Sequence, residues 1–283
     1  MKYRILSIAI SLILFTFSNV FSQEENIAAS STVRAVKANS SKPSYIKMTV
    51  RNAPALTLQF SGGYNFGVFE LAGNNNGDFN PKEFAVGENF GVRHGVGGNL
   101  TMKIPLHERG NLRLDVSALY NCFSSKFSKA NTGTSPNDYV QYRVYSGEIG
   151  LENNFTPNYK FKTLVGAGIV GSVISGNATL IDLSGIKNLT IIPAFRLGVS
   201  LYSGVEYAMS NKLGLNFGFK FTHANLWFKQ TKESSDPNKI YLNDQREVPR
   251  PQYSGFKQFA WGSFYAGVNV YFGVTPKEYI FRK

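Results

Sequence analysis

Histidine and cysteine are the residue types of this chain best suited to chemistry, and they are few: three histidines and one cysteine. The run Thr222-His223-Ala224-Asn225 places a histidine beside a hydroxyl and an amide. A histidine activates a nucleophile only within hydrogen-bond reach, whereas adjacent residues of a strand point to opposite faces. Thr222 is therefore a poor partner for His223, and the Asn225 amide cannot become an alkoxide. We predict no catalytic residues.

Spacing also argues against metal and cofactor sites. His94, His107 and His223 lie far apart in the sequence, and the single Cys122 allows neither a cysteine-based zinc site nor an intramolecular disulfide. Glycine pairs such as Gly62-Gly63 do not open a helix after a strand, so they suit strand bending better than phosphate binding. We predict no metal site, no cofactor-binding residue and no cofactor.

The elements that would position any site are β-strands. Charged residues make up only 17% of the 283 residues and apolar residues 43%, which excludes a disordered chain and a charge-rich coiled coil. From residue 55 onward apolar and polar residues alternate with a period of two, as is typical of strands. Leu112 and Leu114, for example, alternate with Arg113 and Asp115. Eight such stretches predict eight strands.

The connections between these strands are predicted to alternate in length. Tight turns are expected at Pro105–Gly110, Thr156–Phe161 and Ser210–Lys212, and long loops at Glu70–Asn89, Ser124–Asp138, Gly176–Ile191 and Lys229–Lys257. Short turns at one end and long loops at the other are typical of an outer-membrane barrel. Ile46, Met48 and Val50 also alternate, so a further short strand fits there. Ten strands remain an alternative if residues 44–52 join the wall.

The first segment predicts export. Met1–Arg4 is basic, Ile5–Phe17 is apolar, and Val20-Phe21-Ser22 offers fairly small residues for cleavage, which is the pattern of a secretory signal. The apolar run is shorter than the ~20 residues of a spanning helix. We predict a signal peptide over residues 1–22, a periplasmic N-terminal extension over 23–54, an outer-membrane β-barrel over 55–273 and a periplasmic C-terminal tail over 274–283.

The predicted fold class is all-β: an eight-stranded antiparallel transmembrane β-barrel with short periplasmic turns and long extracellular loops, located in the cell outer membrane. A soluble sandwich or lipocalin-like barrel would alternate in the same way. A soluble barrel and a membrane barrel differ in which face of the strands is buried inside the protein. In a soluble barrel the apolar face is a buried core, whereas in a membrane barrel the polar face lines the lumen, where charges must be paired.

Ten charged residues are predicted to share that polar face. They are Arg93, Lys103, Arg113, Arg143, Arg196 and Lys220, with Asp115, Glu148, Glu152 and Glu206. The interior of an eight-stranded barrel is just wide enough for side chains to fill. We therefore expect these charges to interlock as a polar plug that leaves no sizeable solute channel.

Aromatic residues gather where strands meet loops, which suits a membrane–water interface. They are Phe66, Phe69, Tyr139, Tyr142, Trp227, Phe228, Phe259 and Trp261. Cys122 lies among the apolar positions of its strand and is predicted to be lipid-facing or interfacial. The proline- and tyrosine-containing loop Lys229–Lys257 is predicted to be the main external contact surface, because long loops are often functional.

Several runs resemble a known family. Tyr145-Ser146-Gly147-Glu148-Ile149-Gly150-Leu151, Ser203-Gly204-Val205-Glu206-Tyr207 and Gly267-Val268-Asn269-Val270-Tyr271-Phe272-Gly273 resemble the outer-membrane β-barrel family of Bacteroidota often labelled PorT-like, over residues 55–273. Gly150, where members often carry proline, and the tail Val274–Lys283 depart from the pattern. The resemblance implies an aromatic-ended last strand that assembly machinery reads, and a role in the envelope such as a secretion or assembly complex.

A second resemblance concerns activity. Lipid A deacylases built on eight-stranded barrels carry a His-x-Ser-Asn run on a late strand, with serine as nucleophile, but here Asn225 takes the position of that serine. We therefore predict a non-enzymatic structural or accessory protein of the envelope. A lipid A-modifying enzyme and a loop-mediated binding or adhesion protein remain the alternatives.

The net charge of +12 bears on partners. Nucleic acid is an implausible partner for an exported barrel, whereas a basic protein is attracted to anionic lipid headgroups. The predicted partners are outer-membrane lipid and lipopolysaccharide, together with an envelope protein complex.

Overall fold

The computed structural model describes residues 45–51, 53–72, 90–127, 138–157, 159–182, 185–232, 234–245, 257–274 and 276–282. These residues belong to two units, one of residues 51–275 and one that combines residues up to 50 with residues from 276 onward. The predicted signal peptide, residues 1–22, lies outside the described residues. Within them, no helix is long and apolar enough to cross a membrane.

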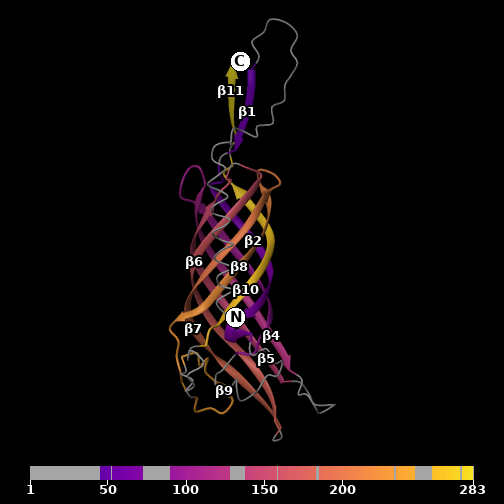
Figure 1. Ribbon diagram of the computed structural model, residues 1–283, viewed down its shortest axis with the longest axis vertical. Helices are drawn as coiled ribbons and strands as arrows, with labels where there is room; N and C mark the ends of the chain where they lie inside the picture. The colour runs from indigo at the N-terminus through magenta and orange to yellow at the C-terminus, as the bar shows by residue number, and fades with distance from the viewer. Residues whose placement is uncertain are drawn as a thin grey trace, which may run out of the picture. The chain divides into compact units, whose positions relative to one another are not determined.

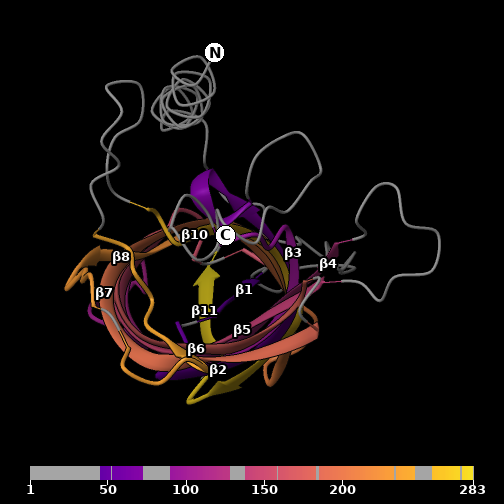
Figure 2. The ribbon, with the colours of Figure 1, turned by 90° about the horizontal axis from the view of Figure 1, so that it is seen from below.

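Eight antiparallel strands of the described chain close into a barrel (Figures 1 and 2). They are β2 (Leu56–Val68), β3 (His94–Pro105), β4 (Leu112–Phe127), β5 (Asp138–Asn154), β6 (Phe161–Asp182), β7 (Gly185–Ala208), β8 (Leu213–Trp227) and β10 (Ala260–Phe272). Each pairs with the next along the chain, and β10 pairs with β2 from Ala260↔Val68 to Phe272↔Leu56. Because the ring of strands is closed, no strand of the wall has an unpaired edge along its central part. The predicted eight-stranded antiparallel barrel is confirmed.

Alternation along the strands separates an apolar outer face from a polar inner face. On β8, Leu215 and Phe217 are exposed while Asn216 and Lys220 are buried. On β10, Val268 is 41% exposed and its neighbour Asn269 is fully buried. A soluble barrel would bury the first set and expose the second. The polarity is therefore that of a barrel whose outer wall faces hydrocarbon.

Three turns are short, as predicted: those between Pro105 and Leu112, between Asn154 and Phe161, and between Ala208 and Leu213. In the long connection between β8 and β10, the described residues hold only the two-residue strand β9 (Lys239–Ile240), which pairs in parallel with β7. The connection between β2 and β3 begins with the one-turn 3-10 helix η1 (Phe69–Leu71). Much of this connection and of that between β4 and β5 lies outside the described residues.

The prediction of a long loop at Gly176–Ile191 is wrong. These residues extend β6 and β7 into a hairpin, paired up to Asp182↔Gly185, with only residues 183 and 184 between the strands (Figure 1). The hairpin is held by burial as well as pairing, since Ala178 and Leu189 are 1% and 5% exposed. Here apolar residues face inward and polar residues such as Asn177 and Thr190 are exposed, which is the reverse of the pattern expected for the wall.

The terminal unit is a two-stranded sheet of β1 (Tyr45–Arg51) and β11 (Pro276–Arg282). The short strand that fits Ile46, Met48 and Val50 is confirmed. It pairs with the C-terminal tail rather than with a barrel strand, so the ten-stranded alternative is wrong.

Candidate functional site

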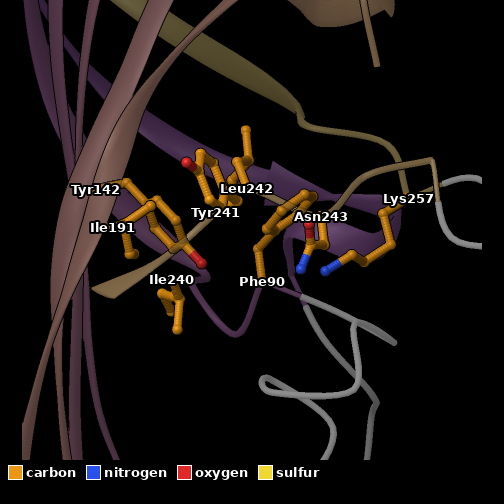
Figure 3. Close-up of a pocket in the computed structure, with 8 residues that line it drawn as sticks. All are labelled: Phe90, Tyr142, Ile191, Ile240, Tyr241, Leu242, Asn243 and Lys257. Atoms are coloured by element: carbon orange, nitrogen blue, oxygen red, sulfur yellow. The ribbon is translucent and has the colours of Figure 1, made fainter. Parts of the chain in front are cut away.

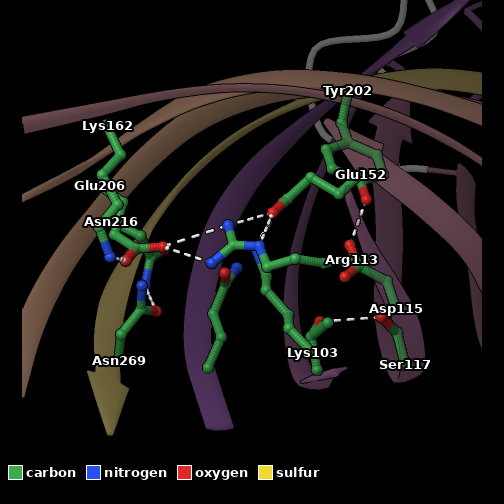
Figure 4. Close-up of polar contacts among 12 residues, drawn as sticks. Lys103, Arg113, Asp115, Ser117, Glu152, Lys162, Tyr202, Glu206, Asn216 and Asn269 are labelled. Carbon is green, nitrogen blue, oxygen red and sulfur yellow. Dashed lines mark hydrogen bonds and ion pairs between the residues drawn. The ribbon is translucent and has the colours of Figure 1, made fainter. Parts of the chain in front are cut away.

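The lumen contains a network of buried charges centred on Arg113 (Figure 4). Its Nε donates to Glu152 Oε1 at 2.6 Å, and its Nη1 lies 3.3 Å from Glu206 Oε2. Lys103 Nζ lies 2.6 Å from Glu152 Oε2, and Lys162 Nζ lies 2.7 Å from Glu206 Oε1. Two carboxylates thus face three cations. Arg113 lies on β4 and Glu206 on β7, with β5 and β6 between them in the ring, so this contact crosses the lumen.

Further contacts cross the lumen beside this network. The Tyr202 hydroxyl on β7 donates to Asp115 on β4, and Lys220 on β8 pairs with Glu148 on β5. Ser200 Oγ also donates to Glu148 Oε1, at 2.9 Å. These bonds fill the interior with paired polar groups, as an eight-stranded barrel allows. The predicted polar plug is therefore present.

Most of the predicted inner charges point inward. Eight of the ten are buried: Lys103, Arg113, Asp115, Glu148, Glu152, Arg196, Glu206 and Lys220. Sequence reading missed Lys162, because glycines leave the facing of residues 162–175 unassigned. It also missed Asp244, which lies in the long loop and is fully buried.

The prediction that Arg93 and Arg143 face the lumen is wrong, because both side chains are exposed. The alternation of β5 runs unbroken from Arg143 to Ile149, so Arg143 points outward like Ile149. Arg93 precedes the start of β3, where Gly91 with φ of 67° turns the backbone. Val92, next to this turn, is fully buried.

Aromatic side chains close the loop end of the lumen. Phe259 packs against Phe90, with ring centroids 5.0 Å apart, and against Tyr142, at 5.4 Å. Phe123 packs against Trp261 at 5.4 Å. The interfacial location predicted for Tyr142, Phe259 and Trp261 is therefore wrong: these residues belong to the buried apolar cluster.

The other aromatic residues predicted at the interface lie on or near the surface. Phe69, Trp227 and Phe228 are exposed, while Phe66 and Tyr139 are half-buried. A residue's place at the end of a strand does not reveal which way its ring points.

A buried ion pair fastens the long loop to the wall. Arg196 on β7 donates from Nε to Asp244 Oδ2 at 2.7 Å and from Nη2 to Asp244 Oδ1 at 2.9 Å. Asp244 also accepts from Asn225 Nδ2 at 2.9 Å and from the Gln230 backbone N–H at 3.0 Å. Burial lowers the pKa of the nearby Lys229 ammonium. The described first part of the predicted contact loop is thus tied to the wall through Asp244.

Between this loop and the aromatic cluster lies a cavity of about 80 Å³ (Figure 3). It is lined by Phe90, Tyr142, Ile191, Ile240, Tyr241, Leu242, Asn243 and Lys257. The Lys257 ammonium lies 4.4 Å from the Phe90 ring centroid. The volume is far below the ~300–1,000 Å³ typical of ligand pockets. The cavity is a packing gap with room for a few waters.

The catalytic candidates do not form a reactive set. Thr222 is buried on the inner face, while His223 is half-buried on the outer face. Asn225 is fully buried, donates to the Lys257 carbonyl at 2.9 Å and accepts from the Phe259 N–H at 2.7 Å. Its amide is therefore committed to holding the loop. The described residues contain no group of three His, Cys, Asp or Glu that suits a metal ion.

No protein-family model matches the chain, and no curated protein matches it significantly. Solved structures with similarity include Neisserial surface protein A, at 16% identity over 78% of this chain and 99% of that chain, with a TM-score of 0.42. Ail of Yersinia pestis is 10% identical over 76% of this chain and 98% of its own, with a TM-score of 0.38. The outer membrane protease OmpT of Escherichia coli is 15% identical over 87% and 100%, with a TM-score of 0.34. These similarities are too distant to bear on activity.

Proposed function

We propose that this protein is a non-enzymatic barrel of the outer membrane that serves as a structural or accessory component of the cell envelope. The observation that carries the proposal is the network of paired charges across the lumen. It occupies the space through which a solute would pass, and it engages Arg113, Glu152 and Glu206 with one another. A barrel filled in this way offers its outer wall and its ends for interaction.

The finer role, as part of a secretion or assembly complex, is supported by the resemblance of the barrel strands to PorT-like proteins. The enzymatic alternative is disfavoured because Asn225 stands at the nucleophile position and its amide holds the loop.

A loop-mediated binding role is the second candidate, and one observation favours it. The β6–β7 hairpin and the segment around Asp244 are fastened together, because Arg196 on β7 binds Asp244 and the Leu242 carbonyl, the latter at 3.0 Å. A preordered surface loses less entropy on binding than a mobile loop.

The lumen network can be tested in a planar lipid bilayer. We expect the refolded full-length protein to show no nanosiemens-scale openings, and Arg113→Ala to admit small ions by removing the central cation. Stable large openings in the wild type would contradict a filled lumen. Lipid A from cells with and without the protein would be compared by mass spectrometry in parallel. A mass change that depends on the protein would instead support an enzyme.

A further inference from the structure

The outer wall carries an unexpected basic surface near its loop end. Arg143 on β5 and Lys126 on β4 are both exposed there. Strands on the other side of the ring instead present apolar rings at this end, such as Phe195 and Phe228, with centroids 5.9 Å apart. Arg143 and Lys126 thus place positive charge on the β4–β5 part of the outer wall at this end.

Strand register places polar side chains next to Arg143. Arg143 lies opposite Cys122, and two residues toward the loop end Gln141 lies opposite Ser124, which in turn lies opposite His94. Neighbouring strands are about 4.8 Å apart and successive outward residues about 7 Å apart. The long side chain of Arg143 can therefore meet a ligand that also contacts this polar row.

The guanidinium of Arg143 has a neutral partner in the described part of the chain. Its Nη2 lies 3.4 Å from Gln141 Oε1, a long hydrogen bond. The carboxylates of β4 and β5 with described side chains, namely Asp115, Glu148 and Glu152, all point into the lumen. An outward positive charge is thus left available for an anion.

The surroundings locate this charge at the edge of the membrane. Tyr145 and Tyr120 lie next to Arg143 on the outer face, with ring centroids 5.0 Å apart, and Tyr145 is 54% exposed. Farther along β5, Ile149 and Leu151 are exposed. Tyrosine rings favour the headgroup level, whereas an arginine at the bilayer midplane costs about 2–4 kcal/mol. Arg143 therefore belongs at the level of lipid phosphates.

We propose that Arg143 and Lys126, with the neighbouring Ser124 and Gln141, bind the phosphate headgroup of an anionic membrane lipid. The inference rests on the proposed function, because it requires the wall to face lipid. A guanidinium fork matches phosphate oxygens bidentately, and a lysine adds a point charge. Arg93 lies nearby, but its Nε donates to the Ala72 carbonyl at 3.4 Å, so the site does not depend on it.

The test uses the full chain refolded into nanodiscs of neutral phosphatidylcholine that contain a small fraction of bis-phosphorylated lipid A as the probe. After extraction into detergent, native mass spectrometry counts the lipid A retained per protein. We expect Arg143→Gln to lower the apparent affinity roughly tenfold, because a charged hydrogen bond is lost, and Arg143→Lys to fall between Arg143→Gln and the wild type. Lys212→Gln, in the turn at the other end of the wall, should retain lipid A like the wild type.

Two further arms identify the ligand chemistry. Dephosphorylated lipid A should bind wild type and Arg143→Gln equally and weakly, and millimolar inorganic phosphate should not displace lipid A. Displacement by inorganic phosphate would show an anion site without lipid specificity and overturn the proposal. Equal retention of lipid A by wild type and Arg143→Gln would also overturn it. Should Arg143→Gln fail to fold, Lys126→Gln repeats the comparison. Failure of the wild type to insert into nanodiscs would instead refute the membrane barrel itself.

Discussion

Glu206 is the residue on which the lumen network most depends. It is fully buried and accepts from Lys162 at 2.7 Å, from the Tyr271 hydroxyl at 2.8 Å and from Arg113 at 3.3 Å. Glu206→Gln removes the negative charge and leaves two buried cations undercompensated. We expect a loss of about 3–5 kcal/mol in the free energy of unfolding, as for other broken buried pairs. Equilibrium denaturation of the refolded protein in lipid vesicles measures it.

The matched control is an ion pair of the same chemistry in solvent. Asp236 Oδ2 lies 3.1 Å from Lys239 Nζ, and the two side chains are 40% and 55% exposed. Because water screens such a pair, Asp236→Asn should leave the denaturation midpoint nearly unchanged. If Glu206→Gln unfolds at the same denaturant concentration as Asp236→Asn, the network does not stabilise the barrel.

At the scale of elements, the long loop depends on one anchor. Asp244→Asn removes the charge that Arg196 binds through two hydrogen bonds of 2.7 and 2.9 Å. The segment 228–245 should then detach more often while the barrel stays closed. We expect trypsin to cleave this segment at least about tenfold faster, because cleavage follows the population of the open form. Mass spectrometry of the fragments locates the cut.

Asn243→Ala is the control for that experiment. Asn243 is the neighbour of Asp244 in the chain, and its Oδ1 accepts from the Lys232 backbone N–H at 2.9 Å, outside the buried ion pair. Trypsin should cleave the Asn243→Ala protein nearly as slowly as the wild type. An Asp244→Asn protein that resists trypsin equally well would mean that pairing and apolar packing alone hold the loop.

Much of the barrel could be predicted from the sequence, because period-two alternation directly reports the facing of each strand. It placed Arg113 and Glu206 inside and Leu112 outside. Prediction failed where alternation lapses. Glycines leave 162–175 without a readable facing, and at the loop end strand positions no longer tell whether a ring such as Trp261 points inward. The pairing of Asp244 with Arg196 is long-range and leaves no local pattern.

At the scale of the whole molecule, the barrel is organised in the opposite way to a soluble protein. Its interior holds paired charges, and its wall exposes aliphatic and aromatic side chains such as Phe60, Leu201 and Phe264. In water such a surface would drive aggregation. The fold is therefore stable only where hydrocarbon covers the wall, and strand closure satisfies the backbone there.

Val268 allows this claim to be tested with one substitution. It is 41% exposed and lies midway between Phe264 and Phe272 on the outer face of β10, opposite Phe60 and Leu215 of the neighbouring strands. In a bilayer Val268→Arg should cost about 2–4 kcal/mol, since the charge enters the middle of the hydrocarbon. On a wall exposed to water, the same change would cost almost nothing. Asn211→Arg, at an exposed turn, should be neutral in both settings. Denaturation in vesicles separates these outcomes, and a neutral Val268→Arg would refute the membrane-facing wall.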